Sequence, residues 1–333
     1  MTLRQSLLAG LCLSALWSSL VSAAEPEGKI IRVHKIWDQA PHNAFTDLIR
    51  HDGQWYCVFR EGKGHVSPDG ALRVITSPDG ETWTSAALVT APDADLRDAK
   101  ISITPNGKLC LCGAAAWHKP EKETHQSFLW YSDDGKNWGE RIAIGDPGYW
   151  IWRVIWHKDR AYGIGYKTGR QDHGTRLYVS EDGRTFKTLV AELTDKDSGY
   201  VNEAGMLILP DETFLTVIRR DNKDASAALL GTSHPPYTAW EWKPVGVRIG
   251  GPDLVQIPDG RIIVAGRRYP GGAKTAVWTL NPNDGTLTEI ATLPSGGDNS
   301  YPGLVFHEGQ LWMSYYSSHE GKTAIYLARL QLP

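Results

Sequence analysis

The stretch IRHDGQWYCVFR, residues 49–60, is typical of a β-hairpin, because alternating apolar residues flank an Asp-Gly turn. Five related stretches follow: ITPNGKLCLCGA (103–114), IWHKDRAYGIGY (155–166), ILPDETFLTVIR (208–219), QIPDGRIIVAGR (256–267) and VFHEGQLWMSYY (305–316). Their turns, at Asp52, Asn106, Lys158, Asp211, Asp259 and Glu308, are spaced by 54, 52, 53, 48 and 49 residues. The chain therefore consists of six repeats of one unit.

A second turn signal lies between these hairpins. It reads SPDGETW (77–83), SDDGKNW (132–138) and SEDGRTF (180–186). In this pattern the Ser hydroxyl and the Asp carboxylate hold turn amides, glycine supplies a positive φ angle, and the aromatic residue packs inward. Two hairpins per repeat give four antiparallel strands. The sequence therefore predicts an all-β fold, a six-bladed β-propeller of four-stranded antiparallel blades, in which ring closure removes exposed strand edges.

The N-terminal segment predicts export. Arg4, an apolar run over residues 7–21 and the small residues Val21-Ser22-Ala23 are typical of a secretory signal peptide, here residues 1–23. We expect a single propeller domain over residues 24–333, secreted or periplasmic. No other apolar stretch reaches the roughly 18 residues that a membrane span requires.

Composition narrows the range of partners. The formal net charge of −3 becomes −4 when Arg4 leaves with the signal peptide, so the Lys and Arg excess of a nucleic-acid-binding protein is missing. We expect no nucleic-acid partner, and a monomer. Cys12 leaves with the predicted signal peptide, and the odd set that remains, Cys57, Cys110 and Cys112, excludes a fully paired disulfide framework; we expect buried thiols. The histidines lack metal-ligand spacing, so we predict no metal and no cofactor.

Charged and aromatic residues recur at equivalent positions of the repeats, where a propeller gathers strand ends at one face. Eight residues after the turn come Arg60, Arg219, Arg267 and Tyr316, with Arg220 and Arg268 beside two of them; before the turn come Arg97, Asp98, Trp150, Asn202, Glu203, Ser300 and Tyr301, with Lys100 and Arg153 close behind. Converging guanidinium groups suit a carboxylate or a sulfate. The alternative is that these arginines form ion pairs between blades.

The three Ser-Asp-Gly motifs resemble the Asp boxes of the sialidase superfamily, and by repeat count and motif order the resemblance covers residues 24–333. It implies a tyrosine nucleophile, a glutamate that activates it and an aspartate as acid/base. Tyr301 is similar in position to the nucleophile, Glu203 to the glutamate and Asp69 to the acid/base. The structural alternatives are an aromatic plug for Tyr301, an ion-pair partner of Arg219 for Glu203, and a turn residue for Asp69.

The resemblance also implies that three arginines hold a substrate carboxylate. Arg219 or Arg220 is similar to the second of them, and Arg267 or Arg268 to the third. The first belongs to the opening strand of the first blade, where this chain reads HNAFTD (42–47) and has no arginine. Residues that would replace it from neighbouring positions are Arg60, Arg97 and Lys100.

We therefore predict an exo-glycosidase of the exo-α-sialidase type that hydrolyses a terminal acidic sugar, sialic acid or a related ulosonic or uronic acid, with retention. A neutral tyrosine suits such a substrate, because the sugar carboxylate would repel an anionic nucleophile. Trp150 would stack on a sugar ring or pack between blades. Two further hypotheses are a non-catalytic propeller that binds an acidic glycan or a protein, and a polysaccharide lyase acting on uronates.

Overall fold

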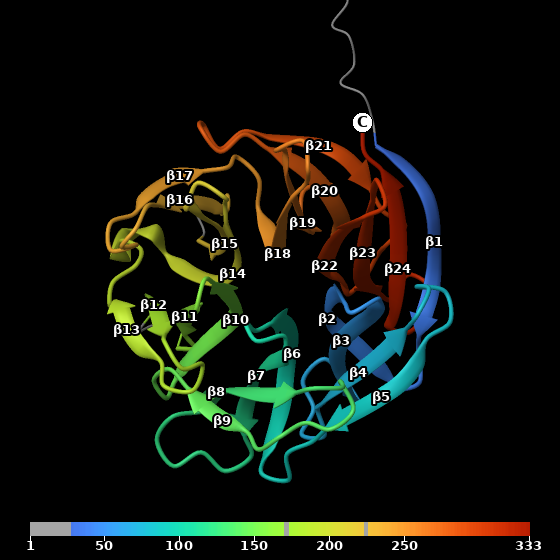
Figure 1. Cartoon of the computed structure of the whole chain (residues 1–333), viewed down its shortest axis with the longest axis horizontal. Coiled ribbons are helices and arrows are strands. Elements are labelled where there is room, and N and C mark those ends of the chain that lie inside the picture. Colours follow the sequence, from blue (N-terminus) through green and yellow to red (C-terminus); the bar gives the residue numbers. More distant parts are fainter. Residues whose placement is uncertain (1–27, 170–172, 223–225) are drawn as a thin grey trace, which may run out of the picture.

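The computed structural model describes residues 28–169, 173–222 and 226–333, so the predicted signal peptide lies outside the described residues. The described residues form strands β1 to β24 and one short 3₁₀ turn, η1 (Lys196–Ser198). The strands make six four-stranded sheets that stand as blades around a central axis (Figure 1). The predicted six-bladed propeller is confirmed. No helix in this part of the chain is long and apolar enough to cross a membrane.

Blades 1 to 5 each begin at the axis and run outward along the chain. Blade 1 holds β2 (His42–His51), β3 (Gln54–Gly62), β4 (Ala71–Ser77) and β5 (Thr84–Val89). Blade 2 holds β6 (Ala94–Ile103), β7 (Leu109–Trp117), β8 (His125–Ser132) and β9 (Ile142–Ile144). Blade 3 holds β10 (Tyr149–His157), β11 (Arg160–Lys167), β12 (Thr175–Ser180) and β13 (Lys187–Val190).

The next two blades repeat this order. Blade 4 holds β14 (Tyr200–Ile208), β15 (Phe214–Asp221), β16 (Leu229–Ser233) and β17 (Glu241–Pro244). Blade 5 holds β18 (Ile249–Gln256), β19 (Ile262–Arg268), β20 (Lys274–Leu280) and β21 (Leu287–Thr292). The hairpin turns predicted from the six repeats each join the first and second strands of a blade.

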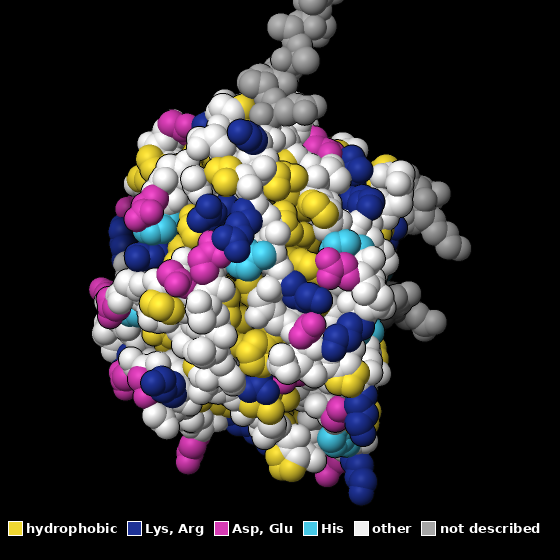
Figure 2. Space-filling model, turned by 90° about the vertical axis from the view of Figure 1, so that its right-hand side faces the viewer, with side chains coloured by type: hydrophobic (Ala, Val, Ile, Leu, Met, Phe, Trp, Pro, Cys, Tyr) yellow, Lys and Arg dark blue, Asp and Glu magenta, His cyan; other side chains and the backbone are white. Residues whose placement is uncertain are grey.

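Blade 6 closes the ring with strands from both ends of the chain. It holds β22 (Asn299–His307), β23 (Gln310–Ser317) and β24 (Ala324–Gln331), and β1 (Lys29–Trp37) pairs antiparallel with β24 as its outermost strand. Trp37 at the end of β1 also donates its indole N–H to Oε1 of Glu61 in blade 1, at 2.6 Å. Figure 2 shows acidic and basic side chains intermingled over this side of the ring.

Every innermost strand carries a β-bulge near its start. In each, two residues face a single residue of the neighbouring strand: Phe45-Thr46, Asp98-Ala99, Trp152-Arg153, Asn202-Glu203, Gly251-Pro252 and Tyr301-Pro302. A bulge re-aims side chains out of the regular alternation of a strand. Because the bulges occur at the same level in all six blades, they bring these residues together around one end of the axis.

The Asp boxes lie at the opposite end of the blades. The first follows Ser77, which pairs with Trp55 beside the hairpin turn of blade 1, whereas the bulge of β2 lies at the other end of that strand. Within the box, Asp79 Oδ1 accepts the backbone N–H groups of Glu81 and Thr82 at 2.8 and 2.9 Å. The boxes therefore cap outer hairpins and take no part in the site described below. Cys57, Cys110 and Cys112 are buried free thiols, as expected.

Candidate active site at the strand bulges

Tyr301, in the bulge of β22, forms the centre of the site. Its φ angle is 53°, and 5% of its surface is exposed. Its Oη donates a hydrogen bond to Oε1 of Glu203 at 2.7 Å and accepts one from Nη1 of Arg219 at 3.0 Å. The same Nη1 donates to Glu203 Oε1 at 2.8 Å. Three groups from blades 4 and 6 thus form a closed triangle, which we call the tyrosine triangle.

Gly251, in the bulge of β18, fixes the other side of Glu203. Its backbone N–H donates to Oε2 of Glu203 at 2.7 Å. Its φ angle is 56°, and a Cβ at this position would lie 2.6 Å from the ring of Tyr301. Glycine is therefore required here on two counts, a left-handed backbone and a close approach to the aromatic ring.

The resting phenol of Tyr301 holds its proton. Burial raises the pKa of Tyr301 well above its ordinary value and the charge of Glu203 acts in the same direction, whereas Arg219 and Arg267 oppose the shift. A protonated phenol becomes a nucleophile only when a base takes its proton. Glu203 accepts the phenol hydrogen bond and is placed to be that base.

Asp98, in the bulge of β6, is a second carboxyl group of the site. Its φ angle is 53°, and 8% of its surface is exposed. Burial raises the pKa of Asp98 to about 7, and the charge of Glu203 adds to this shift, against the opposing charges of Lys100 and Arg97. A carboxyl group that titrates near neutral pH is suited to general acid/base catalysis.

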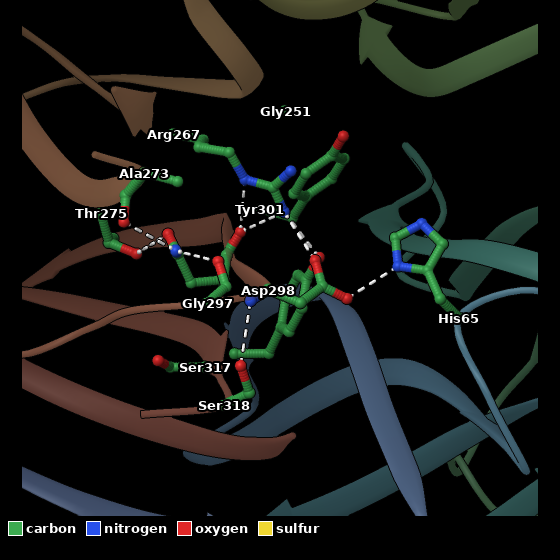
Figure 3. Close-up of polar contacts among 12 residues, drawn as sticks. His65, Gly251, Arg267, Ala273, Thr275, Gly297, Asp298, Tyr301, Ser317 and Ser318 are labelled. Carbon is green, nitrogen blue, oxygen red and sulfur yellow. Dashed lines mark hydrogen bonds and ion pairs between the residues drawn. The ribbon is translucent and has the colours of Figure 1, made fainter. Parts of the chain in front are cut away.

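Arg267 and Asp298 lie beside Tyr301 (Figure 3), and Tyr316 contacts both of them. The guanidinium carbon of Arg267 lies 5.0 Å from the centre of the Tyr301 ring. Arg267 Nη2 donates to Asp298 Oδ1 at 3.0 Å and to the hydroxyl of Tyr316 at 2.8 Å. Tyr316 donates in turn to the same Oδ1 at 2.7 Å. Arg267 thus faces the nucleophile while its charge is balanced by Asp298.

Two histidines of blade 1 reach the other oxygen of Asp298. Oδ2 lies 3.2 Å from Nε2 of His42, at the start of β2, and 2.7 Å from Nδ1 of His65, in the loop after β3. The ring of Phe45 lies between them and the nucleophile, 5.0 Å from His65 and 5.1 Å from Tyr301. Aromatic and histidine side chains therefore occupy the strand where the sialidase resemblance places the first arginine.

The described hydrogen bonds of Asp69 and Arg60 are made to the loop between β3 and β4 and to blade 2. Asp69 is exposed in the loop between β3 and β4, where Oδ1 accepts the N–H of Lys63 at 3.2 Å. Hydrogen bonds from Ser67 and Lys63 outweigh the effect of burial and lower its pKa, which suits a turn residue rather than an acid. Arg60 is fully buried and donates to Asp95, to Ser67 and to the carbonyls of Leu96 and Gly64. These hydrogen bonds give Arg60 a structural role in fixing the loop between β3 and β4.

Lys100 and Arg97 also have structural partners. Lys100 is 2% exposed, and its ammonium donates to the carbonyl of Thr46 at 2.7 Å. It lies near a buried ion-pair network in which Arg153 bridges Asp47 and Asp253, each at 3.0 Å. The side chain of Arg97 is 20% exposed and pairs with Asp95 at 2.6 Å. Of the expected replacements for the first arginine, Arg97 alone keeps an exposed part.

In each of the adjacent arginine pairs, Arg219-Arg220 and Arg267-Arg268, the two side chains have different surroundings. Arg219 faces the bulge of β14, whereas Arg220 pairs with Val201 and donates to the carbonyl of Ala227 at 2.9 Å. Arg267 faces Tyr301, whereas Arg268 forms an exposed ion pair with Glu289 at 3.0 Å. Trp150 is 6% exposed and stacks on Tyr166 of its own blade with a ring separation of 6.1 Å. Its ring also lies 5.2 Å from that of His125 in blade 2, so it packs against the neighbouring blade.

Sequence reasoning did not assign roles to Asp98, His42, His65 or Asp298. Asp98 carries a signal that could have found it, because it lies eight residues before its turn at Asn106, close to the seven that separate Tyr301 from Glu308, and the structure places both first in their bulges. The histidines and Asp298 carry none, since 256 residues separate His42 from Asp298 in the chain and neither follows a ligand spacing. Only the closure of blade 6 onto blade 1 brings them together.

Comparisons with known proteins give structural neighbours only. No family model and no curated protein matches the chain. A Dyadobacter fermentans protein of unknown function is similar over 93% of this chain and 100% of that chain, with a TM-score of 0.83 and 19% identity. An α-L-arabinanase of Penicillium chrysogenum is similar over 91% and 98%, with a TM-score of 0.72 and 14% identity.

A Trypanosoma rangeli sialidase is also similar, over 87% of this chain and 55% of that chain, with a TM-score of 0.69 and 14% identity. This chain thus spans about half the length of that sialidase. At these identities the likeness establishes the fold, and the function has to be argued from the site. The chain has the sialidase-like propeller fold that the Asp-box motifs indicated.

Proposed function

We propose that the chain is an exported glycoside hydrolase that removes a terminal acidic sugar from a glycan with retention of configuration. The observation that carries the proposal is the tyrosine triangle, in which the Tyr301 hydroxyl lies 2.7 Å from the carboxylate of Glu203. The likeness to arabinanase and sialidase propellers supports hydrolysis of a glycosidic bond as the reaction class.

The first step forms a bond between Tyr301 Oη and the anomeric carbon. As it forms, the phenol proton passes to Glu203, and the bond from the anomeric carbon to the leaving oxygen breaks. Asp98, whose pKa of about 7 keeps much of it protonated near neutral pH, gives its proton to that oxygen. The products are a glycosyl-tyrosine intermediate and the free aglycone.

The second step restores the enzyme. Asp98, now ionised, takes a proton from water as the water oxygen attacks the anomeric carbon. The bond to Tyr301 breaks, and the phenolate recovers its proton from Glu203. Two displacements at one carbon give net retention. Arg219, which donates to both Tyr301 and Glu203, stabilises the negative charge as it moves between them.

Two observations support an acidic sugar. The nucleophile is a neutral phenol rather than a carboxylate. A phenol avoids repulsion by a sugar carboxylate attached to the anomeric carbon. Arg219 and Arg267 both reach Tyr301, one by a hydrogen bond and one over the face of the ring. Guanidinium groups in this position are suited to a sugar carboxylate.

One observation favours the same reaction on an uncharged terminal sugar. Arg219 already pairs with Glu203 and Asp221, and Arg267 pairs with Asp298. The described part of the site thus balances its positive charges internally. A neutral sugar would leave these ion pairs intact and would bind through its hydroxyl groups.

The test is release of a chromogenic aglycone from a panel of aryl glycosides of sialic, other ulosonic, uronic and neutral sugars. Tyr301→Phe should lower kcat by at least about 100-fold with one substrate class, because the nucleophilic oxygen is lost. Tyr315→Phe is the matched control, since Tyr315 is also fully buried and donates to the carbonyl of Pro294, away from the triangle.

The outcomes separate the hypotheses. Release that is lost only in Tyr301→Phe supports the proposal, and the substrate class names the sugar. Release that survives in Tyr301→Phe rules out the tyrosine mechanism. If the folded wild-type protein releases no aglycone from any substrate, the proposed hydrolase activity is overturned. A product with a new absorbance near 235 nm from uronate polymers would identify a lyase.

A further inference from the structure

We propose that His42, His65 and Asp298 form a binding site for a divalent transition-metal ion of the Zn²⁺ type, beside the tyrosine triangle. One ligand atom of each residue, Nε2, Nδ1 and Oδ2 respectively, lies within 4.8 Å of the other two. The inference departs from the expectation of no metal, which rested on spacing along the chain. The binding of the ion stands independently of the proposed reaction, and only the identity of its fourth ligand rests on the proposed function.

The donor set matches the chemistry of such ions. Two imidazole nitrogens and one carboxylate oxygen are ligands that Zn²⁺ prefers, at bond lengths of about 2.0–2.2 Å. A tetrahedral ion with these bonds holds its ligand atoms about 3.4 Å apart. The present separations of 3.2 and 2.7 Å from Asp298 Oδ2 require the two rings to move outward only slightly.

Asp298 is held as a ligating carboxylate would be. Its Oδ1 accepts hydrogen bonds from Arg267 at 3.0 Å and from Tyr316 at 2.7 Å. Its backbone N–H donates to the hydroxyl of Ser318 at 2.9 Å. These bonds fix the carboxylate so that Oδ2 faces the two histidines. Hydrogen bonds of this kind orient ligands in metal sites.

The surroundings keep both rings in place while leaving an approach from solvent. The ring of Phe45 lies 6.4 Å from His42 and 5.0 Å from His65. The side chain of His42 is 11% exposed, that of Asp298 is 27% exposed and that of His65 is 53% exposed. An ion can therefore enter past His65, and Figure 3 shows this ring across from Asp298.

Three protein ligands leave one coordination position open. In zinc sites of this composition the open position takes water or a substrate oxygen. Because Arg267 contacts both Asp298 and the ring of Tyr301, the ion would lie within the proposed sugar site. Its fourth ligand would be a hydroxyl or carboxylate oxygen of the bound glycan.

The experiment measures metal binding without substrate. The purified chain is freed of metal with a chelator and titrated with Zn²⁺ by calorimetry and with Co²⁺ by visible absorption, which reports the coordination geometry. We expect one ion per chain. His65→Ala and Asp298→Asn should each weaken binding by at least about 10-fold, because each loses a ligand. His51→Ala is the control, since His51 is bonded to the carbonyl of Gly107 at the far end of β2.

Two results would overturn the proposal: no stoichiometric uptake by the folded wild-type chain, or equal uptake by His65→Ala and wild type. His65 is more than half exposed, so its loss should leave the fold intact, and circular dichroism checks this for every variant. Metal binding by a wild-type chain that hydrolyses none of the aryl glycosides would contradict the proposed function and leave the metal site standing.

Discussion

Asp98 links the chemistry of the site to pH at the scale of one residue. Because burial raises its pKa to about 7, the acid form is lost as the pH rises through that value. We expect kcat/KM of the wild-type chain to fall over the same range. Asp98→Asn should lower kcat by roughly 10²–10⁴-fold with a poor leaving group, as loss of a general acid does. A pH profile of aryl glycoside hydrolysis measures both effects.

We expect Asp98→Asn to lower activity but to raise the stability of the folded chain. The folded chain binds the Asp98 proton more tightly than the unfolded chain, whose ordinary value is 3.8, so wild-type stability falls as the pH rises from about 4 to 7. Asparagine cannot ionise and tolerates the φ angle of 53°. Asp98→Asn should therefore gain stability relative to wild type, by up to about 4 kcal/mol at pH 8. Equal urea unfolding midpoints of the wild-type chain at pH 5 and pH 8 would contradict the raised pKa of Asp98.

The sequence pointed to Tyr301, Glu203 and Arg219 together, and the structure brings these three into contact. The three could be named together because the sialidase resemblance gave each a position on a strand end, and their roles stay a prediction. The position assigned to the acid/base, Asp69, followed from its nearness to the first Asp box. Distance along the chain does not decide which carboxyl group becomes buried, so the raised pKa of Asp98 could not be predicted from it.

At the scale of single elements, the Asp boxes should contribute to stability alone. Asp134 Oδ1 accepts the backbone N–H groups of Lys136 and Asn137 at 2.9 and 2.8 Å, and these bonds, that of Asn137 first, hold its pKa below the ordinary value. We expect Asp134→Ala to lower the Tm by a few degrees without changing kcat. The Tm difference from wild type should shrink as the pH falls and the carboxylate of Asp134 becomes protonated.

The neighbouring Asp133 supplies the control for this prediction. Its carboxylate is 78% exposed and pairs only with Lys108 among its described contacts, at 3.0 Å. Exposed ion pairs of this kind contribute little to stability. Asp133→Ala should therefore leave the Tm near that of wild type. A similar fall in both variants would show that the charge of the turn, and not its capping bonds, matters.

The bulges are the elements that sequence patterns could not reveal. Alternation and turn residues predicted where each innermost strand lies, because these signals depend on neighbours in the chain. A bulge adds one residue without any required residue type, and here the six positions hold Phe45, Asp98, Trp152, Asn202, Gly251 and Tyr301. What the six share is the extra residue in the strand; Phe45, Asp98, Gly251 and Tyr301 also have a positive φ angle, and the side chains differ.

At the scale of the whole molecule, stability depends on β1. This strand completes blade 6 beside β24, and Arg32 and Trp37 also contact Glu81 and Glu61 of blade 1. We expect deletion of residues 1–40 to expose the edge of β24 and to open the ring. The variant should lose its single cooperative thermal transition and associate in solution, which calorimetry and light scattering measure. Deletion of residues 1–27 alone, which spares β1, should preserve the transition.

The number of blades could be predicted from the sequence, because each blade corresponds to one repeat of similar length. The strand that closes the ring could not be predicted, since β1 precedes the first repeat hairpin and carries no turn motif of its own. Its partner is chosen by the free edge that β24 leaves after all six blades are in place. That choice belongs to the assembled ring and to no local pattern.

The pairing of β1 with β24 also determines when the ring can close during protein synthesis. Roughly 290 residues separate the two strands, and a ribosome adding about 5–20 residues per second needs roughly 15–60 s to make them. During that interval β1 has no partner, while the blades between are already able to fold. The native ring is completed only after β24 has been made, so a chain interrupted before β24 is left with two unpaired edges.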